Sequence, residues 1–308
     1  MYGYWMYKRI LSPVDGSKPA AETLTQVVKL CRWVGAELVL ATIMDGRQLR
    51  AQGFDLPDEL AQSAGGARRV IALHSKLEAR VNAAAQAVKR AGVTVTTVVR
   101  HGDAAEQIVA ATTDLECDLV AMAPQAHWGL REQLLGSVTE QVLHRSLVPV
   151  AIVRPGGAAF FAETKGAARA AGSIIVPLDG SESTEAALPA ARALADAFQR
   201  RLQLVLILRP PPDDAVAAER LEAAIMQRDA ERYLAGLMEE LRADGLEAYS
   251  EVIAGDPVAE LASRATLSGA TALVLSARRR SPKSARLFGG VIGPLIRRTH
   301  GTLLIVPR

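Results

Sequence analysis

Two copies of the tripeptide Asp-Gly-Ser carry the first side chains that could do chemistry. Each copy ends a short apolar run, as RILSPVDGS at residues 9–17 and as SIIVPLDGS at residues 173–181. An aspartate at the exit of a buried strand can accept hydrogen bonds from a base amino group or a ribose hydroxyl. Asp-Gly-Ser is also an ordinary strand-to-helix turn in which the serine caps the helix. We interpret the two serines as caps and, because the motif recurs at the same place, favour a ligand role for Asp15 and Asp179.

A second candidate is the segment that joins a later strand to the last helix of each copy. It reads DLVAMAPQAHWGLREQLLGS at residues 118–137 and TALVLSARRRSPKSARLFGG at residues 271–290. The late glycine would open a helix, whose free N–H groups and dipole suit an anion. Both copies keep the same spacing of candidate anion-binding positions, at Ala123, Ala126, Gly136 and Ser137 and at Ser276, Arg279, Gly289 and Gly290.

Two features of these segments have competing explanations. Ser137 and Glu140 match the capping box S-x-x-E, which would occupy the same hydroxyl that a phosphate would need. In the second copy five basic residues within nine could grip phosphate oxygens or could form a solvated loop, and the sequence favours neither. A nucleic-acid patch is a weaker third interpretation, because no stacking aromatic residues are interleaved. These basic residues are Arg278, Arg279, Arg280, Lys283 and Arg286.

The chain is an internal duplication. Four blocks recur in order, with an offset of 164 residues at the Asp-Gly-Ser motif (181 minus 17) and of 153 at a later Gly-Asp motif (255 minus 102). A deletion of 11 residues after the second strand of the second copy accounts for the difference. We therefore expect two domains, at residues 1–155 and 172–308, joined by a Gly/Ala-rich linker at 156–171.

Each copy alternates five short apolar runs with helical patterns. This alternation predicts the α/β class, with a five-stranded parallel, doubly wound, Rossmann-like sheet in each copy and the strand order 3-2-1-4-5. In that order the first and fourth strands flank the crevice where ligands bind in open α/β sheets. The two candidate segments of each copy would then face one crevice.

Composition and the absence of certain motifs argue against a membrane protein, a nucleic-acid-binding protein and a metalloprotein. No apolar run approaches the roughly 18 residues of a membrane helix, and a net charge of +3 is too slight to argue for nucleic acid. Cys31 and Cys117 lack CxxC spacing, so we expect them to be core residues with free thiols, in a protein of the reducing cytoplasm. The five histidines show no ligand pairing, so we expect no metal site, and neither a GxSxG elbow nor a GxxxxGK[ST] loop is present.

These motifs together resemble those of the universal stress protein family, and the whole chain looks like a tandem member with two copies of that domain. The family signature is G-x2-G-x9-G-[ST], preceded by a V-D-G-S turn. The resemblance implies that ATP, with Mg²⁺, is the ligand and that an aliphatic residue of the second strand, here Ile43 or Ile207, helps the aspartate to hold the adenosine. The glycine and hydroxyl positions would hold the ribose and phosphates.

The signature departs from the family pattern in both copies. Alanine replaces two glycines in the first copy, which adds a Cβ where phosphate would approach, and Arg279 and Gly290 replace a glycine and the hydroxyl in the second. No general base, metal ligand set or Walker lysine is visible, so we expect no enzyme. The expectation is a cytoplasmic stress-response protein that binds an adenine nucleotide. The alternative is a nucleotide-independent module that meets a protein partner.

The fifth strand of each copy ends its sheet with an exposed edge unless another strand pairs with it. In this family the corresponding strands commonly pair two domains. The resemblance therefore implies that VPVAIV (148–153) and TLLIV (302–306) pair within one chain in a pseudo-two-fold arrangement. The sequence leaves a further homodimer open.

Overall fold

The computed structural model describes residues 7–46, 64–124, 135–154, 172–267, 272–277, 291–299 and 301–308. The chain separates into two compact units. Nearly all described residues before Pro155 belong to unit 1, and those from Gly172 onward belong to unit 2. The predicted linker, 156–171, lies outside the described residues.

Unit 1 is a parallel five-stranded sheet in the order β3-β2-β1-β4-β5. This is the predicted doubly wound order, so the fold class inferred from the sequence is confirmed for this unit. Along the chain its elements are β1 (Arg9–Pro13), α1 (Lys18–Val34), β2 (Glu37–Met44), α4 (Ala64–Arg90), β3 (Val95–His101), α5 (Ala104–Asp114), β4 (Leu119–Met122), α6 (Ser137–Arg145) and β5 (Val150–Ile152).

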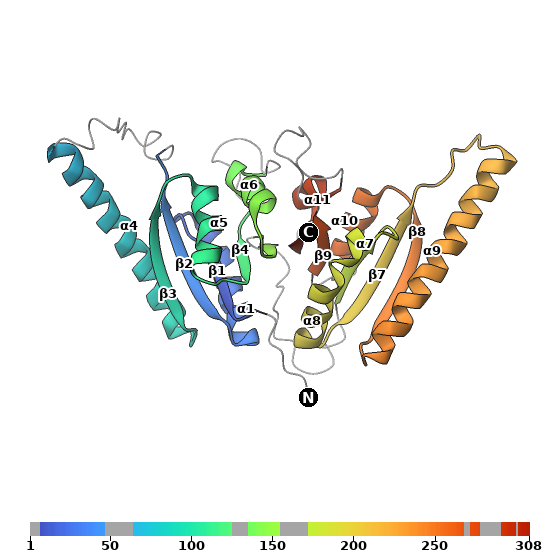
Figure 1. The fold of residues 1–308 in the computed structure, drawn as a ribbon, viewed down its shortest axis with the longest axis horizontal. Coiled ribbons are helices and arrows are strands. Elements are labelled where there is room, and N and C mark those ends of the chain that lie inside the picture. Colours follow the sequence, from blue (N-terminus) through green and yellow to red (C-terminus); the bar gives the residue numbers. More distant parts are fainter. Residues whose placement is uncertain are drawn as a thin grey trace. The chain divides into compact units, whose positions relative to one another are not determined.

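Unit 2 repeats the arrangement, with parallel strands in the order β8-β7-β6-β9-β10 (Figure 1). Its elements are β6 (Ser173–Leu178), α7 (Glu182–Glu185), α8 (Leu188–Phe198), β7 (Arg201–Leu208), α9 (Ala217–Ala243), β8 (Ala248–Ala254), α10 (Pro257–Leu267), β9 (Ala272–Ala277), α11 (Ile292–Arg298) and β10 (Thr302–Pro307). The expected pairing of β5 with β10 concerns how the two units meet, and it stays a prediction.

Local signals explain where the elements of unit 1 begin and end. Ser17 has an extended backbone and accepts a hydrogen bond from the backbone N–H of Ala20, which caps α1 as predicted. Gly35 ends that helix in the left-handed conformation, with φ of 69°. Asp103 caps α5 by accepting from the N–H of Glu106. The central strands β1 and β4 are buried, as expected where helices cover both faces of a parallel sheet.

The helix predicted to run on from Ser181 is divided into two. The first piece, α7, is four residues long, and α8 begins only at Leu188. Pro189 lies in the first turn of α8, where its missing N–H costs nothing, whereas inside a continuous helix it would remove a hydrogen bond to Glu185. The break therefore follows from this proline.

Two further expectations concern the interior and the membrane. Both cysteines are buried free thiols, as predicted. None of the helices in the described part of the chain combines the length and the apolar run that a membrane crossing requires.

Candidate functional site

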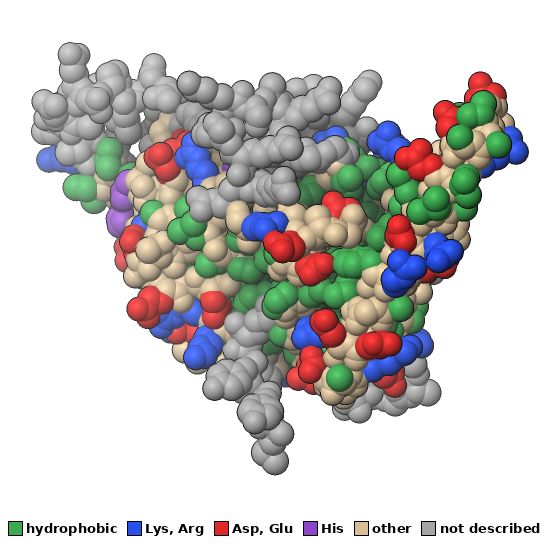
Figure 2. All heavy atoms as spheres, turned by 45° about the vertical axis from the view of Figure 1, so that its right-hand side comes forward, with side chains coloured by type: hydrophobic (Ala, Val, Ile, Leu, Met, Phe, Trp, Pro, Cys, Tyr) green, Lys and Arg blue, Asp and Glu red, His purple; other side chains and the backbone are tan. Residues whose placement is uncertain are grey.

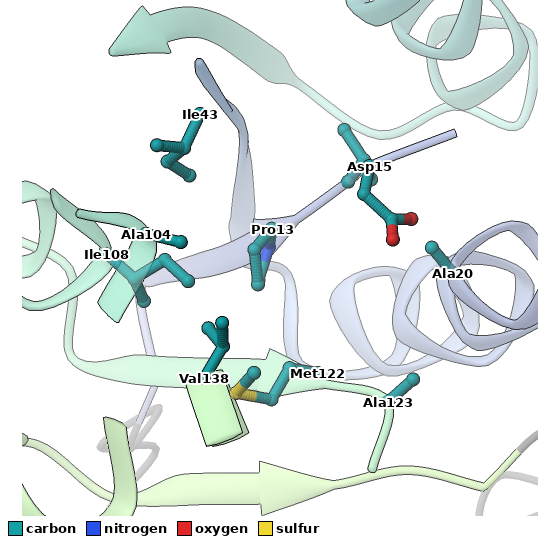
Figure 3. Close-up of a pocket in the computed structure, with 10 residues that line it drawn as sticks. Pro13, Asp15, Ala20, Ile43, Ala104, Ile108, Met122, Ala123 and Val138 are labelled. Carbon is teal, nitrogen blue, oxygen red and sulfur yellow. The ribbon is translucent and has the colours of Figure 1, made fainter. Parts of the chain in front are cut away.

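In unit 1 the ends of β1, β2 and β4 surround a small pocket. Three predicted site residues, Asp15, Ile43 and Ala123, lie in its wall. Figure 3 shows the Asp15 carboxylate on the side of the pocket where Ala20 and Ala123 lie, with Ile43 on the opposite side. The enclosed space is about 50 Å³, within open space of about 510 Å³ that includes solvent. The complete lining is Pro13, Val14, Asp15, Ala20, Ile43, Ala104, Ile108, Met122, Ala123 and Val138.

The turn that carries Asp15 is held from two directions. The backbone N–H of Ser17 donates to Asp15 Oδ1 at 2.9 Å, and Arg80 Nη2 donates to the backbone oxygen of Asp15 at 2.6 Å. Gly16, between Asp15 and Ser17, has φ of +78°, and a Cβ at this position would lie 1.1 Å from Arg80 Nη2. Glycine is therefore required here both for its backbone conformation and for the close approach of the guanidinium.

The start of α6 differs from the predicted capping box. Gly136 is the extended N-cap residue, and the helix has no side-chain capping hydrogen bond. Ser137 is the first helical residue, so its hydroxyl is not at the position from which an N-cap side chain reaches the following N–H groups. The capping-box prediction was wrong by one residue. Ser137 is exposed, and the competing structural use of its hydroxyl is removed.

Buried polar residues that sequence reasoning missed hold the strand ends in place. Thr139 Oγ1 donates to the backbone oxygen of Ala123 at 3.3 Å, which ties the start of α6 to the end of β4. Thr42 Oγ1 donates to the backbone oxygen of Val14 at 2.6 Å. Asp45 is 5% exposed and accepts from the N–H of Ala104 at 3.3 Å. Asp45 directly follows β2 as Asp15 follows β1, and this position was the signal available in the sequence.

In unit 2 the aspartate of the motif is bonded within its own turn. Asp179 Oδ1 accepts from the Ser181 N–H at 3.0 Å, from Ser181 Oγ at 2.6 Å and from Thr184 Oγ1 at 2.8 Å. Burial alone would raise the pKa of Asp179, but the hydrogen bonds from Ser181 and Thr184 outweigh it and hold the pKa below its usual value. This geometry fits the turn interpretation for Asp179 better than it fits the ligand interpretation.

The other predicted residues of unit 2 are placed as follows. The Ser276 hydroxyl donates to the backbone oxygen of Ser183. Ile207 follows Leu206, which pairs with Leu178 directly before Asp179, so Ile207 and Asp179 lie at the same end of the sheet. Four predicted positions, Ala126, Arg279, Gly289 and Gly290, lie outside the described residues, as does the rest of the basic run.

The arrangement in unit 1 suits a ligand with an apolar part and an anionic part. Ile43, Ile108 and Met122 give apolar surface, and Asp15 offers a carboxylate acceptor at the mouth. On the side of Val138, the first turn of α6 presents N–H groups that no side chain caps. Such groups, together with the helix dipole, favour negative charge.

Comparison with known proteins places this fold in a family. A model of the universal stress protein family matches residues 6–154 and again residues 171–307. The crystal structure of a universal stress protein from Archaeoglobus fulgidus covers 100% of this chain and 98% of its own, with 20% identity and a TM-score of 0.72, which shows the same fold.

Shorter relatives match one half of the chain. The universal stress protein MJ0577 of Methanocaldococcus jannaschii is 29% identical over 157 residues, which are 48% of this chain and 96% of the relative. The universal stress protein Sll1654 of Synechocystis is 27% identical over 155 residues, 49% of this chain and 88% of the relative. Since the family model matches both halves in succession, the chain belongs to the universal stress protein family and carries two copies of its domain.

Proposed function

We propose that this protein acts in the stress response of the cytoplasm and that unit 1 binds an adenine nucleotide, ATP together with Mg²⁺, without turning it over efficiently. The observation that supports the proposal is the meeting of Asp15, Ile43 and Ala123 in one pocket, next to the uncapped first turn of α6. Asp15 and Ile43 would hold the adenosine, and the N–H groups of α6 with the Ser137 hydroxyl would hold phosphate oxygens. Mg²⁺ would offset charge on the phosphates.

The proposal places the functional site in unit 1 rather than in unit 2. The carboxylate of Asp179 already accepts three hydrogen bonds from its own turn, and a ligand hydroxyl would compete with them. The Ser276 hydroxyl is likewise engaged, by the backbone of Ser183. A ligand at unit 2 would have to break these contacts, which lowers its net affinity.

Calorimetric titration of the full chain with ATP and MgCl₂ tests this function. We expect one site per chain, lost in Asp15→Ala and retained in the matched variant Asp179→Ala. At a nucleotide concentration 100 times the dissociation constant, binding stabilises the folded unit by about 2.7 kcal/mol, which a thermal shift detects. Phosphate release should stay at the background rate. Loss of binding in Asp179→Ala with retention in Asp15→Ala would reverse the assignment of the site.

A nucleotide-independent interaction module of the same fold is the second candidate. The observation that favours it is the enclosed space of about 50 Å³, well below the roughly 300–1,000 Å³ of ordinary ligand pockets. The alanines at two signature positions point the same way. If millimolar ATP with Mg²⁺ gives no binding heat and no thermal shift, the nucleotide proposal fails and this second function is retained.

A further inference from the structure

Unit 2 contains a second hollow, away from the residues of the Asp-Gly-Ser crevice. It is a groove of about 310 Å³ between α9, the end of β8 and the segment that leaves β7. None of Asp179, Ile207 or Ser276 lines it. Its volume falls within the range of roughly 300–1,000 Å³ found for small-molecule sites. The lining is Leu208, Arg209, Pro210, Pro211, Ala223, Met226, Gln227, Val252, Ile253 and Ala254.

The same place in unit 1 holds a pair of histidines. Helices α4 and α9 and strands β3 and β8 correspond at a constant offset of 153 residues, so His74 corresponds to Gln227 and His101 to Ala254. In unit 1 the His74 and His101 rings are stacked, with centroids 5.2 Å apart and an interplanar angle of 20°. Burial, and secondarily the neighbouring His74, lower the pKa of His101, which keeps its ring neutral at pH 7.

At three positions around the groove, unit 2 carries a smaller or differently bonded side chain than unit 1. Ala254 offers a methyl group in place of the His101 ring, and Ala223 replaces Val70 by the same offset. Gln227 donates through Nε2 to Glu231, one turn further along α9, at 3.1 Å. The space that two stacked rings fill in unit 1 is therefore open in unit 2.

The wall of the groove is fixed before any ligand arrives. Leu208 is followed by Arg209 and then by three prolines, Pro210 to Pro212, whose rings hold φ near −65°. Only eight residues separate β7 from α9, against 19 between β2 and α4. A wall of this kind gives up little conformational entropy when a ligand binds.

The chemistry of the lining is apolar with one cation. Six of its ten residues are aliphatic, proline or methionine side chains other than alanine, and Arg209 is the one charged residue in this described lining. Arg209 is exposed, and within the described residues no ion pair engages its guanidinium. Met226 is 51% exposed, and hydrophobic side chains are also visible on the projecting end of α9 in Figure 2, where Leu221 and Ile225 are exposed. An apolar body would bury such surface, and an anionic group would meet Arg209.

We propose that this groove binds a small organic anion with an apolar body, such as an aromatic sulfonate or a medium-chain aliphatic carboxylate. The apolar body lies against Met226, Val252 and Ile253, in the space that the histidine pair occupies in unit 1. The anionic group lies at the rim, beside the guanidinium of Arg209. The site is independent of the proposed nucleotide pocket in unit 1.

Fluorescence titration of the full chain with 1-anilinonaphthalene-8-sulfonate, followed by competition with decanoate, tests the proposal. The double variant Gln227→His/Ala254→His imports the residues of unit 1, and we expect it to weaken binding at least tenfold. Ala223→Val restores the third residue of unit 1 and should weaken binding in the same direction, which keeps the test usable if the double variant folds poorly. Leu221→Gln, at an exposed residue outside both pockets, should leave the titration unchanged.

The role of Arg209 is tested by comparing the binding of a charged and an uncharged probe. Arg209→Gln should weaken the sulfonate probe by roughly tenfold, the value of one hydrogen bond to a charged group, and should leave the uncharged analogue N-phenyl-1-naphthylamine unaffected. Unchanged binding of the sulfonate in both Gln227→His/Ala254→His and Ala223→Val would overturn the groove as the site. Equal loss of the charged and uncharged probes in Arg209→Gln would overturn the assignment of the ligand as an anion.

Discussion

Arg80 on α4 donates to the backbone oxygen of Asp15 at 2.6 Å and lies directly over the Asp-Gly-Ser turn. The corresponding residue of α9 is Tyr233, whose hydroxyl donates instead to Glu185 at 2.8 Å. Burial, and after it the bond to Glu185, raise the pKa of Tyr233 above its usual value, so this hydroxyl stays protonated. The two units thus share a turn but support it differently, which makes matched substitutions informative.

Gly16→Ala and Gly180→Ala form such a matched pair. Both glycines have positive φ, +78° and +80°, but a Cβ would meet Arg80 only at Gly16, since nothing lies within 4 Å at Gly180. We expect Gly180→Ala to cost roughly 1–2 kcal/mol of unfolding free energy, from backbone strain alone. Gly16→Ala should cost about 1 kcal/mol more, because it displaces Arg80 from the backbone of Asp15.

Urea unfolding of the full chain measures both costs, and Arg80→Ala completes the cycle for Gly16. In the Gly16→Ala background Arg80→Ala should cost nothing further, because the contact is already lost. Additive costs for the two changes would show that the guanidinium does not support this turn.

Asp179 should make the stability of unit 2 depend on pH in acid. Its folded-state pKa lies below the ordinary value of about 3.9, so its contribution is present above that value and is lost as the pH falls through the folded-state pKa. Asp179→Asn keeps an oxygen acceptor and removes the charge. We expect the difference in unfolding free energy between wild type and this variant to be constant near neutral pH and to shrink in stronger acid.

Denaturant titrations between pH 3 and pH 7 give that difference. Thr184→Val removes one donor to Asp179 Oδ1 and should reduce the acid dependence without abolishing it, because Ser181 still donates. A difference that stays constant down to pH 3 would contradict the assigned hydrogen bonds.

Thr139→Val tests whether the start of α6 is positioned by its bond to β4. Thr139 is fully buried and donates to the backbone oxygen of Ala123, so the isosteric valine leaves that oxygen without its side-chain donor. We expect a loss of about 1 kcal/mol in unfolding free energy and weaker ATP binding. Thr139→Ser keeps the hydroxyl and should retain most of the nucleotide affinity. Equal ATP affinity in the two variants would exclude a positioning role.

The thiols of Cys31 and Cys117 should be inert in the folded protein. Burial raises the pKa of Cys31 to about 12 and that of Cys117 to about 11, and both side chains are nearly inaccessible. The thiolate is the nucleophile, so iodoacetamide at pH 8 should label neither residue in native protein and both in denaturant. Mass spectrometry of the labelled peptides checks this, and rapid native labelling of Cys117 would show that its strand end opens.

The fold could be predicted from the sequence because its signals are local and occur twice. Apolar runs of strand length, the cap at Ser17 and the stop at Gly35 each depend on neighbouring residues only. Since both copies carry the same order of signals, the strand order 3-2-1-4-5 followed from general rules of connection. The division of the helix after Ser181 follows from Pro189, whose effect on a helix is also local.

The candidate site was harder to predict because its interactions cross the fold. Asp15, Ile43 and Ala123 could be brought together through the strand order. The hydrogen bonds that differ between the two copies could not be predicted. Thr184 replaces Ala20 and Tyr233 replaces Arg80, on helices whose rotation the sequence does not give. The stacking of His74 on His101 likewise depends on how a helix lies against a strand 27 residues away.

The long helices α4 and α9 are both 27 residues, although 19 residues precede the first and only eight precede the second. The pairing of the second strand with the third is also unchanged, residue for residue, between the two units. The two copies thus show that connections of different length at this junction are compatible with the same strand pairing. A fluorescent reporter can therefore be inserted between β2 and α4, beyond the buried Asp45, because the strand pairing is the same with either length of connecting chain.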